Sequence, residues 1–194
     1  QEKRKWLDDI EPRLNRNITI GILGMGYLGS FVGRKLKDLG YNIIGFKNTK
    51  PLFKYPFTVF SKKIDLNKLI KRSDVIISIL PSTEKTYHII DNNFLKNMKK
   101  NSLLINVGRG STLSEKALVN HLKKNRNCYA SLDVFENEPL SKFNQLWKLK
   151  NVIITPHVAC LTVVNSAVEY MYSRYLNYQK YKKIKSDVNY KKGY

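Results

Sequence analysis

The sequence predicts an α/β fold, a doubly wound parallel sheet covered by helices. Short apolar, β-branched runs alternate with segments of helical periodicity along most of the chain. A glycine-rich turn, GMGYLG at residues 24–29, separates the first apolar run from the first helical segment. The 194 residues, 42% of them hydrophobic, suffice to bury one core.

The N-terminal third predicts a strand–helix–strand unit. Residues 18–23 are nearly all apolar, which is typical of a strand buried on both faces. Apolar residues then recur at helical spacing, at Leu28, Val32, Leu36 and Leu39. Residues 41–46 form a second apolar strand, so the unit has the length of one parallel crossover, about 30 residues.

The same alternation continues to residue 155. Side chains at Asp65, Asp91 and Ser114 are expected to cap the N-termini of three helices. Four further strands are expected, over residues 74–80, 102–107, 128–134 and 151–155. A longer amphipathic helix follows, with apolar residues at Leu161, Val164, Val168, Met171, Tyr172 and Tyr175.

The net charge of the chain is strongly positive. Lys and Arg number 35 against 15 Asp and Glu, which gives a formal charge of +20. Such an excess is typical of nucleic-acid binding when it is clustered. Here it is mostly Lys and is spread along the whole chain, which favours compositional drift, so nucleic acid is not the expected partner.

Other bulk features exclude several classes of protein. No apolar run reaches the length of about 18 residues that a membrane span needs, so no membrane association is expected. Cys128 and Cys160 have no metal-ligand spacing, which indicates reduced thiols in a cytoplasm and no metal site. The chain begins without Met, and we expect it to be a piece of a longer protein.

The glycine turn predicts a Rossmann-type dinucleotide site. Gly24 permits a tight turn, Gly26 lets a pyrophosphate approach the backbone, and Gly29 allows close helix–strand packing. Unpaired N–H groups at the following helix N-terminus would face the phosphates. The expected contacts of this turn are Gly24, Met25, Gly26, Tyr27, Leu28 and Gly29.

The end of the second predicted strand indicates which dinucleotide binds. NAD sites usually place an acidic residue there to bind the ribose 2′-hydroxyl. This chain has no acid there, and Lys47, Thr49 and Lys50 are suited to a 2′-phosphate, with Asn48 beside them. The sequence therefore favours NADP, with NAD as the alternative. The other explanation for Lys47 and Lys50 is the general lysine excess of the chain.

Three side chains with complementary chemistry follow three successive predicted strands. Arg109 lies after the strand at 102–107, Glu138 after that at 128–134, and His157 after that at 151–155. Carboxyl ends of parallel strands meet at one edge of a sheet, where ligands bind. We therefore expect Arg109, Glu138 and His157 at one catalytic site.

This trio suits the reduction of a 2-oxo acid. Arg109 would bind the substrate carboxylate through two parallel hydrogen bonds. His157 would give a proton to the ketone oxygen as hydride arrives, and Glu138 would orient the imidazole. Each residue type alone is more often structural, so the hypothesis depends on their combination.

Five motifs in order resemble the D-isomer-specific 2-hydroxyacid dehydrogenase family. They lie at residues 24–29, 80–86, 106–110, 132–139 and 155–159. Within the family, Trp147 and the ending at 188–194 resemble the glyoxylate/hydroxypyruvate reductases. The resemblance covers essentially the whole chain.

The resemblance implies an activity and further site residues. It implies NADPH-dependent reduction of glyoxylate to glycolate and of hydroxypyruvate to D-glycerate, by a homodimer. It repeats the roles above for Arg109, Glu138 and His157, and puts Asp133 near the nicotinamide carboxamide. The remaining implied cofactor contacts are Leu80, Pro81, Ser82, Thr83, Val107 and Gly108.

The resemblance also defines domains and departures. Residues 1–14 resemble the family's linker helix, 15–159 its NAD(P)-binding domain, and 160–194 the helix and tail that return to a substrate domain mostly absent from this chain. Asn48 and Val163 stand where close relatives tend to have Arg.

Two other functions are compatible with the sequence. The same fold serves nucleotide-sensing binding modules and corepressor-like proteins, because fold does not fix function. An inactive remnant of an enzyme is the second alternative. The retained trio argues against a pure binding module, which has little need of a paired proton donor.

Overall fold

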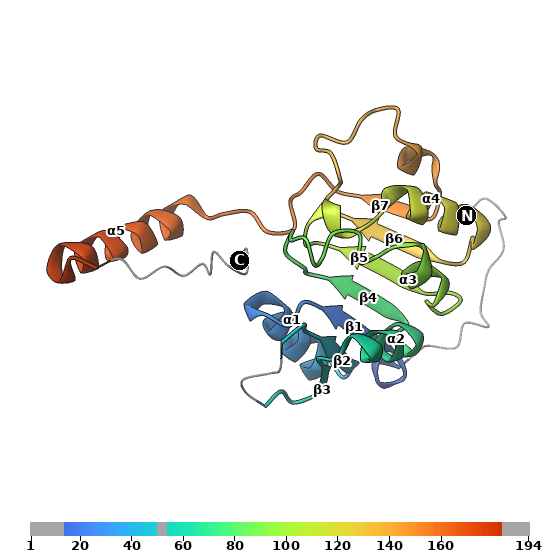
Figure 1. Cartoon of the computed structure of the whole chain (residues 1–194), viewed down its shortest axis with the longest axis horizontal. Helices are drawn as coiled ribbons and strands as arrows, with labels where there is room; N and C mark the ends of the chain where they lie inside the picture. The colour runs from blue at the N-terminus through green and yellow to red at the C-terminus, as the bar shows by residue number, and fades with distance from the viewer. Residues whose placement is uncertain (1–13, 50–53, 184–194) are drawn as a thin grey trace.

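Seven parallel strands form one sheet, which confirms the predicted fold class. The computed structural model describes residues 14–49 and 54–183, so most of the predicted linker, Lys50 and the end of the predicted tail lie outside the described residues. The strand order is β3-β2-β1-β4-β5-β6-β7 (Figure 1). The strands are β1 Thr19–Leu23, β2 Asn42–Phe46, β3 Thr58–Phe60, β4 Val75–Ser78, β5 Leu103–Asn106, β6 Tyr129–Leu132 and β7 Val152–Ile154.

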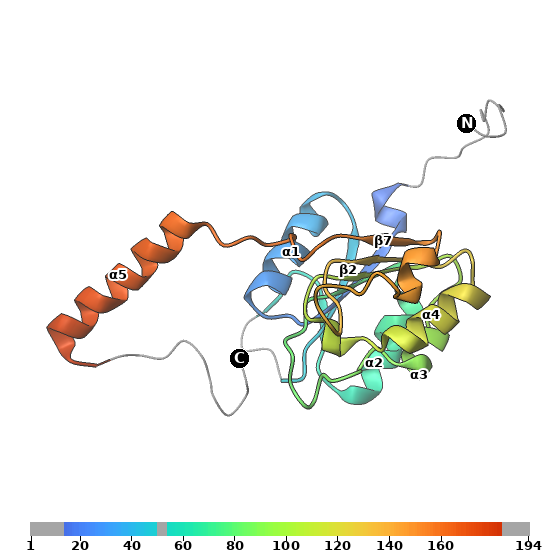
Figure 2. The same cartoon turned by 90° about the horizontal axis from the view of Figure 1, so that it is seen from above.

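Helices cover the two faces of the sheet unequally. Helix α1 (Tyr27–Asp38) lies on one face, while α2 (Lys63–Arg72), α3 (Asn92–Lys96) and α4 (Glu115–Lys124) lie on the other (Figure 2). Two apolar clusters follow this division, a large one under α2 to α4 and a smaller one under α1. Short 3-10 turns complete the described part, at η1 Asn15–Asn17, η2 Gly110–Thr112 and η3 Gln145–Lys148.

The strand order reverses direction between β1 and β4. The chain winds outward from β1 to β3, crosses back through α2 to β4, and then winds outward to β7. In such sheets a crevice opens beyond the carboxyl ends of the strands at the reversal point. The turn at residues 24–29 follows β1 at this place.

Two of the three predicted helix caps are confirmed and one is wrong. The Asp91 carboxylate accepts the Phe94 N–H at 2.8 Å, and the Ser114 hydroxyl accepts the Ala117 N–H at 3.4 Å. Helix α2 instead begins after Lys62, with Asp65 inside its first turn and paired to Lys68 at 2.8 Å. An acid in the first turn still suits the helix dipole, which explains why the residue resembles a cap in the sequence.

Strand β3 was not expected from the sequence. It is only three residues long and lies at the edge of the sheet, paired to β2 alone. The segment before it contains Pro51 and Pro56, which break the apolar pattern.

Helix α5 (Val164–Tyr181) confirms the predicted C-terminal helix. It projects away from the sheet in both views, and none of its residues is buried (Figures 1 and 2). No helix within residues 14–49 and 54–183 is long and apolar enough to cross a membrane.

Candidate active site

The glycine turn closes tightly after β1. Gly24 has a φ of +98°, a left-handed conformation that glycine adopts without steric cost, and its N–H donates to the Phe46 carbonyl at 3.0 Å. A Cβ on Gly29 would lie 2.1 Å from the Gly24 carbonyl oxygen, so α1 packs directly on the turn. A Cβ on Gly26, by contrast, would meet no atom within 4 Å. The space in front of Gly26, at the N-terminus of α1, is therefore open.

The turn residues differ in what they present to this open space. Met25 is 0% exposed and lies in the smaller core cluster, so it is part of the packing beneath the turn. Tyr27 is 88% exposed and Leu28 is also exposed. Gly26 precedes the helix and no side chain caps it. The first N–H groups of α1 thus remain available to an anion.

Three of the predicted cofactor segments meet in space. A Cβ on Gly24 would lie 2.6 Å from the Ile79 carbonyl oxygen, and a Cβ on Gly108 would lie 2.7 Å from the backbone N and O of Leu80. The glycine turn, the segment that begins at Leu80 and the Val107–Gly108 segment therefore form one continuous backbone surface. Leu80 is buried, whereas Ser82 is exposed and its hydroxyl lies 2.8 Å from that of Ser111.

The residues predicted to select the nucleotide lie at the end of β2. The Lys47 N–H donates to the Phe60 carbonyl at 3.0 Å, which extends the pairing of β2 with β3. Lys47 is half-buried, and Asn48 and Thr49 are exposed. No carboxylate occupies this stretch.

His157 and Glu138 form a direct pair. The His157 Nδ1 atom lies 2.7 Å from Glu138 Oε2, and the second carboxylate oxygen, Oε1, accepts the Phe135 N–H at 2.9 Å. Burial would raise the pKa of Glu138, but the hydrogen bonds from His157 and Phe135 and the charge of His157 lower it overall. The carboxylate is therefore held ionised beside the imidazole, and the ring presents Nε2 away from Glu138.

Asp133 fixes the segment that carries His157. Its carboxylate accepts hydrogen bonds from the Thr155 hydroxyl at 2.5 Å and from the N–H groups of Val158 and Ala159, both at 3.0 Å. Its backbone carbonyl accepts the His157 N–H at 2.8 Å. Asp133 is 4% exposed, and although burial raises its pKa, these hydrogen bonds lower it overall. We call these contacts the Asp133 cradle.

The cradle holds His157 in an uncommon conformation. His157 has a φ of +54°, in the left-handed region that costs a side-chain-bearing residue free energy. The contacts of Asp133 fall on both sides of His157, at Thr155 and at Val158 and Ala159. The conformation that turns the ring toward Glu138 is thus maintained by a neighbouring strand end.

Arg109 lies on the same edge but does not join the pair. It follows β5, and its Nη1 donates to the Gly108 carbonyl at 2.7 Å. Within the described residues no hydrogen bond or ion pair links it to Glu138 or His157. Its backbone carbonyl accepts bonds from Thr112 Oγ1 at 2.7 Å and Asn106 Nδ2 at 3.3 Å. The exposed guanidinium is available to a ligand.

Several residues that hydrogen-bond to the predicted site residues were not predicted from the sequence. Asn106, Thr112 and Thr155 contact the backbone or side chains of site residues, yet lie in ordinary apolar or turn stretches. Tyr55 was missed as well, although its hydroxyl donates to the Met25 carbonyl at 3.0 Å. A polar residue within an apolar stretch could have indicated these contacts, because buried polar groups need hydrogen-bond partners.

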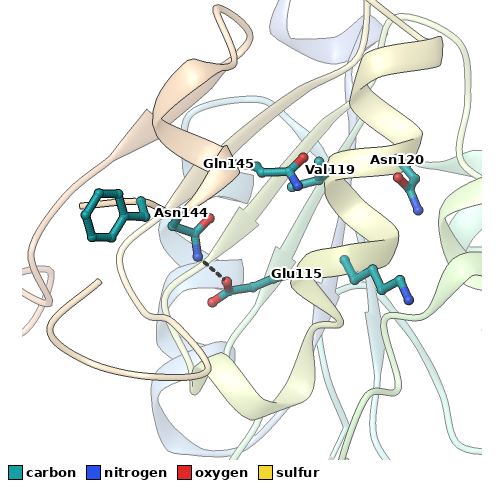
Figure 3. A pocket seen from close by; sticks show the side chains of 7 residues that line it. Glu115, Val119, Asn120, Asn144 and Gln145 are labelled. Atoms are coloured by element: carbon teal, nitrogen blue, oxygen red, sulfur yellow. Dashed lines mark hydrogen bonds between the residues drawn. The ribbon is translucent and has the colours of Figure 1, made fainter. Parts of the chain in front are cut away.

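A surface hollow of about 370 Å³ lies elsewhere, between α4 and the loop before β7 (Figure 3). Asn144 Nδ2 donates to Glu115 Oε2 at 2.8 Å across it. Its lining contains none of the predicted site residues; it consists of Glu115, Lys116, Val119, Asn120, Phe143, Asn144 and Gln145. The hollow is therefore separate from the predicted site at the strand edge.

Residues 1–159 match the NAD binding domain of the D-isomer specific 2-hydroxyacid dehydrogenases. The chain belongs to this family. The family resemblance of the five motifs is thereby confirmed. In the part of the chain that the structure describes, no group of three His, Cys, Asp or Glu side chains is arranged to hold a metal ion.

Relatives within the family include 2-oxo acid reductases. The chain is 32% identical over 169 residues to glyoxylate/hydroxypyruvate reductase A of Yersinia enterocolitica, covering 87% of this chain and 54% of that protein. The chain thus spans about half the length of that relative.

Solved structures extend the likeness to the backbone. A family member from Xanthobacter autotrophicus Py2, in complex with NADPH and MES, superposes with a TM-score of 0.91 at 27% identity over all of this chain and 79% of that chain. The NADPH-dependent glyoxylate/hydroxypyruvate reductase of Sinorhizobium meliloti, in complex with NADP and sulfate, gives 0.89 at 29% identity, covering all of this chain and 62% of that chain.

Proposed function

We propose that this chain is the cofactor-binding part of an NADPH-dependent reductase of small 2-oxo acids, with glyoxylate and hydroxypyruvate as substrates. The observation that carries the proposal is the His157–Glu138 pair, 2.7 Å apart at the edge that also presents Arg109. The names of the Yersinia and Sinorhizobium relatives support the choice of substrates.

The residues fit a dinucleotide. The open space at Gly26, the uncapped N-terminus of α1 and the continuous backbone surface from Gly24 to Gly108 suit a pyrophosphate and the nicotinamide half beyond it. The acid-free end of β2, with Lys47 and Thr49, suits a 2′-phosphate. We therefore propose NADP as the preferred cofactor. Bound NADPH supplies the hydride.

Each side chain of the trio has a distinct part in the reduction. Arg109 binds the substrate carboxylate and orients the ketone. His157 donates a proton from Nε2 to the ketone oxygen as the carbonyl carbon accepts the hydride, which yields the 2-hydroxy acid. Glu138 holds Nδ1 at 2.7 Å and stabilises the imidazolium before that transfer.

NADPH oxidation with glyoxylate tests the proposal, with hydroxypyruvate as second substrate. This chain covers 62% of the Sinorhizobium reductase, so the assay compares this chain alone with one to which the N-terminal half of that reductase is added. We expect turnover in the extended chain and a fall of about 10²- to 10⁴-fold in kcat for His157→Ala, the range for a lost acid–base catalyst. Equal activity of His157→Ala would remove His157 from the mechanism.

Binding separates the alternatives. A chain that binds NADPH but never turns over would be a nucleotide-sensing module or a remnant. Tighter binding of NADH than of NADPH would overturn the cofactor preference. A strongly salt-dependent affinity for DNA would instead support the corepressor-like alternative.

We further propose the domain division that the resemblance implies. Residues 15–159 would form the NAD(P)-binding domain, 1–14 would correspond to the family's linker, and 160–194 to the segment that returns to the substrate domain. A cytoplasmic location suits Cys128 and Cys160, which are both free thiols. Water exclusion in the complete enzyme would come from closure of the substrate domain over the trio.

A further inference from the structure

We infer that Tyr55 is a positioning residue for the cofactor, because its hydroxyl turns the backbone of the glycine turn toward the pyrophosphate. This inference rests on the proposed function. Tyr55 is 8% exposed and lies under the turn, between β2 and β3. Its Oη donates to the Met25 carbonyl at 3.0 Å, and the two residues are 30 positions apart in the sequence.

The geometry of the peptide bond gives this contact its effect. The Met25–Gly26 peptide is trans, so its carbonyl and the Gly26 N–H point in opposite directions. Tyr55 binds the carbonyl from the core side, which directs the Gly26 N–H outward. A Cβ on Gly26 would meet no atom within 4 Å, so this N–H borders the open space of the predicted site.

A second hydroxyl acts on the next peptide in the same way. Ser30, 3% exposed, donates its Oγ to the Gly26 carbonyl at 2.5 Å, and its N–H donates to the same oxygen at 3.0 Å. The Ser30 Oγ and the Tyr55 Oη lie 3.5 Å apart. Two successive carbonyls of the turn are thus bound on the protein side, and the N–H groups of Gly26 and Tyr27 are directed away from them.

Packing against neighbouring residues fixes the position of Tyr55. Its ring packs with Phe57, with centroids 5.8 Å apart, and the Phe57 ring would lie 2.7 Å from a Cβ on Gly33 of α1. The same segment therefore contacts both α1 and the turn that precedes it. Electrostatically, the two hydroxyls also keep carbonyl oxygens from facing a dianionic pyrophosphate, where they would repel it.

Ligand binding to the intact chain tests the inference. We expect Tyr55→Phe to weaken NADPH binding by about five- to tenfold, the effect of one lost hydrogen bond. Binding of adenosine 2′-monophosphate, which has the 2′-phosphate but no pyrophosphate, should change by less than about twofold. A merely structural role would weaken both ligands alike. Titration calorimetry measures both, and thermal melting checks that the variant is folded.

Two further variants complete the design. Tyr41→Phe is the matched control, since Tyr41 packs on the same apolar cluster but lies at the far end of α1, and it should leave NADPH binding unchanged. Ser30→Ala removes the other hydroxyl and should also weaken NADPH selectively, which tests the same idea if Tyr55→Phe fails to fold. Unchanged NADPH affinity in both variants, or equal losses for both ligands, would overturn the inference. If the unaltered chain binds no dinucleotide, the proposed function itself falls.

Discussion

At the residue scale, the conformation of His157, the proposed proton donor, depends on the Asp133 carboxylate, which makes no hydrogen bond to the imidazole. Thr155, Val158 and Ala159 all donate to the Asp133 carboxylate, and His157 lies between them with a φ of +54°. The resemblance implied a place for Asp133 near the nicotinamide carboxamide, and that role stays a prediction. In the structure, the same carboxylate positions the segment that carries His157.

The ionised form of Asp133 should contribute to stability in a defined pH range. Its folded-state pKa is lowered, so the contribution is fully present above the unfolded pKa, about 3.9, and is lost as pH falls through the folded value. We expect Asp133→Asn to lower the free energy of unfolding by about 1–3 kcal/mol at neutral pH, because an amide cannot accept every bond of the cradle. The difference should shrink below about pH 4.

Urea unfolding at several pH values measures this difference. Asp38→Asn, at an exposed position at the end of α1, is the control and should cost little at any pH. A destabilisation by Asp133→Asn that stays constant down to about pH 3 would show that the charge of the carboxylate is not what matters.

The sequence predicted which residues lie at the site, but not the hydrogen bonds between them. The order of Arg109, Glu138 and His157 after three strands predicted their common edge, because parallel strands share a direction. The bonds that orient them join residues 19 to 26 positions apart, through atoms whose positions depend on loop geometry. Apolar periodicity carries no information about such contacts, so the cradle and the Tyr55 contact could only come from the structure.

At the element scale, strands and helices followed their local signals closely. Every predicted strand is present, with ends trimmed by one to a few residues, because terminal residues of an apolar run need not be paired. The short edge strand β3 was not predicted, because three residues are too few to show an alternating apolar pattern. The first residue of each helix was harder to predict. An acidic residue at the N-cap and one in the first turn give the same pattern in a sequence.

The difference between cap and first turn is measurable. Asp91→Ala should cost about 1 kcal/mol of stability, since it removes the carboxylate that accepts the Phe94 N–H at 2.8 Å. Asp65→Ala should cost about half of that or less, since it removes only a partly exposed pair with Lys68 and a dipole interaction. Thermal or urea unfolding of the two variants decides, and a larger loss for Asp65→Ala would contradict the assignment of the cap.

At the scale of the whole molecule, the sheet is covered unevenly. Helix α1 lies over β1 and β2, whereas on the same face β5 to β7 leave Tyr129 and Ile153 more than half exposed. A homodimer, which the family resemblance implies, would bring further protein surface to this domain. It stays a prediction, as does the substrate domain.

Light scattering during size-exclusion chromatography measures the assembly. We expect twice the chain mass of 22.6 kDa at micromolar concentration, and the same mass at high salt, because an apolar interface is not weakened by screening. A monomer at all concentrations would contradict the predicted homodimer.

The outlying position of α5 predicts that this helix unfolds separately from the sheet. An 18-residue helix with no buried residue gains little from tertiary packing, and such helices are marginal in water. Its amide hydrogens should therefore exchange with deuterium far sooner than those of β1 or β4, which open only with the whole sheet. His157 precedes α5, and Asp133 at the end of β6 holds it, so we expect melting of α5 to leave the His157–Glu138 pair in place.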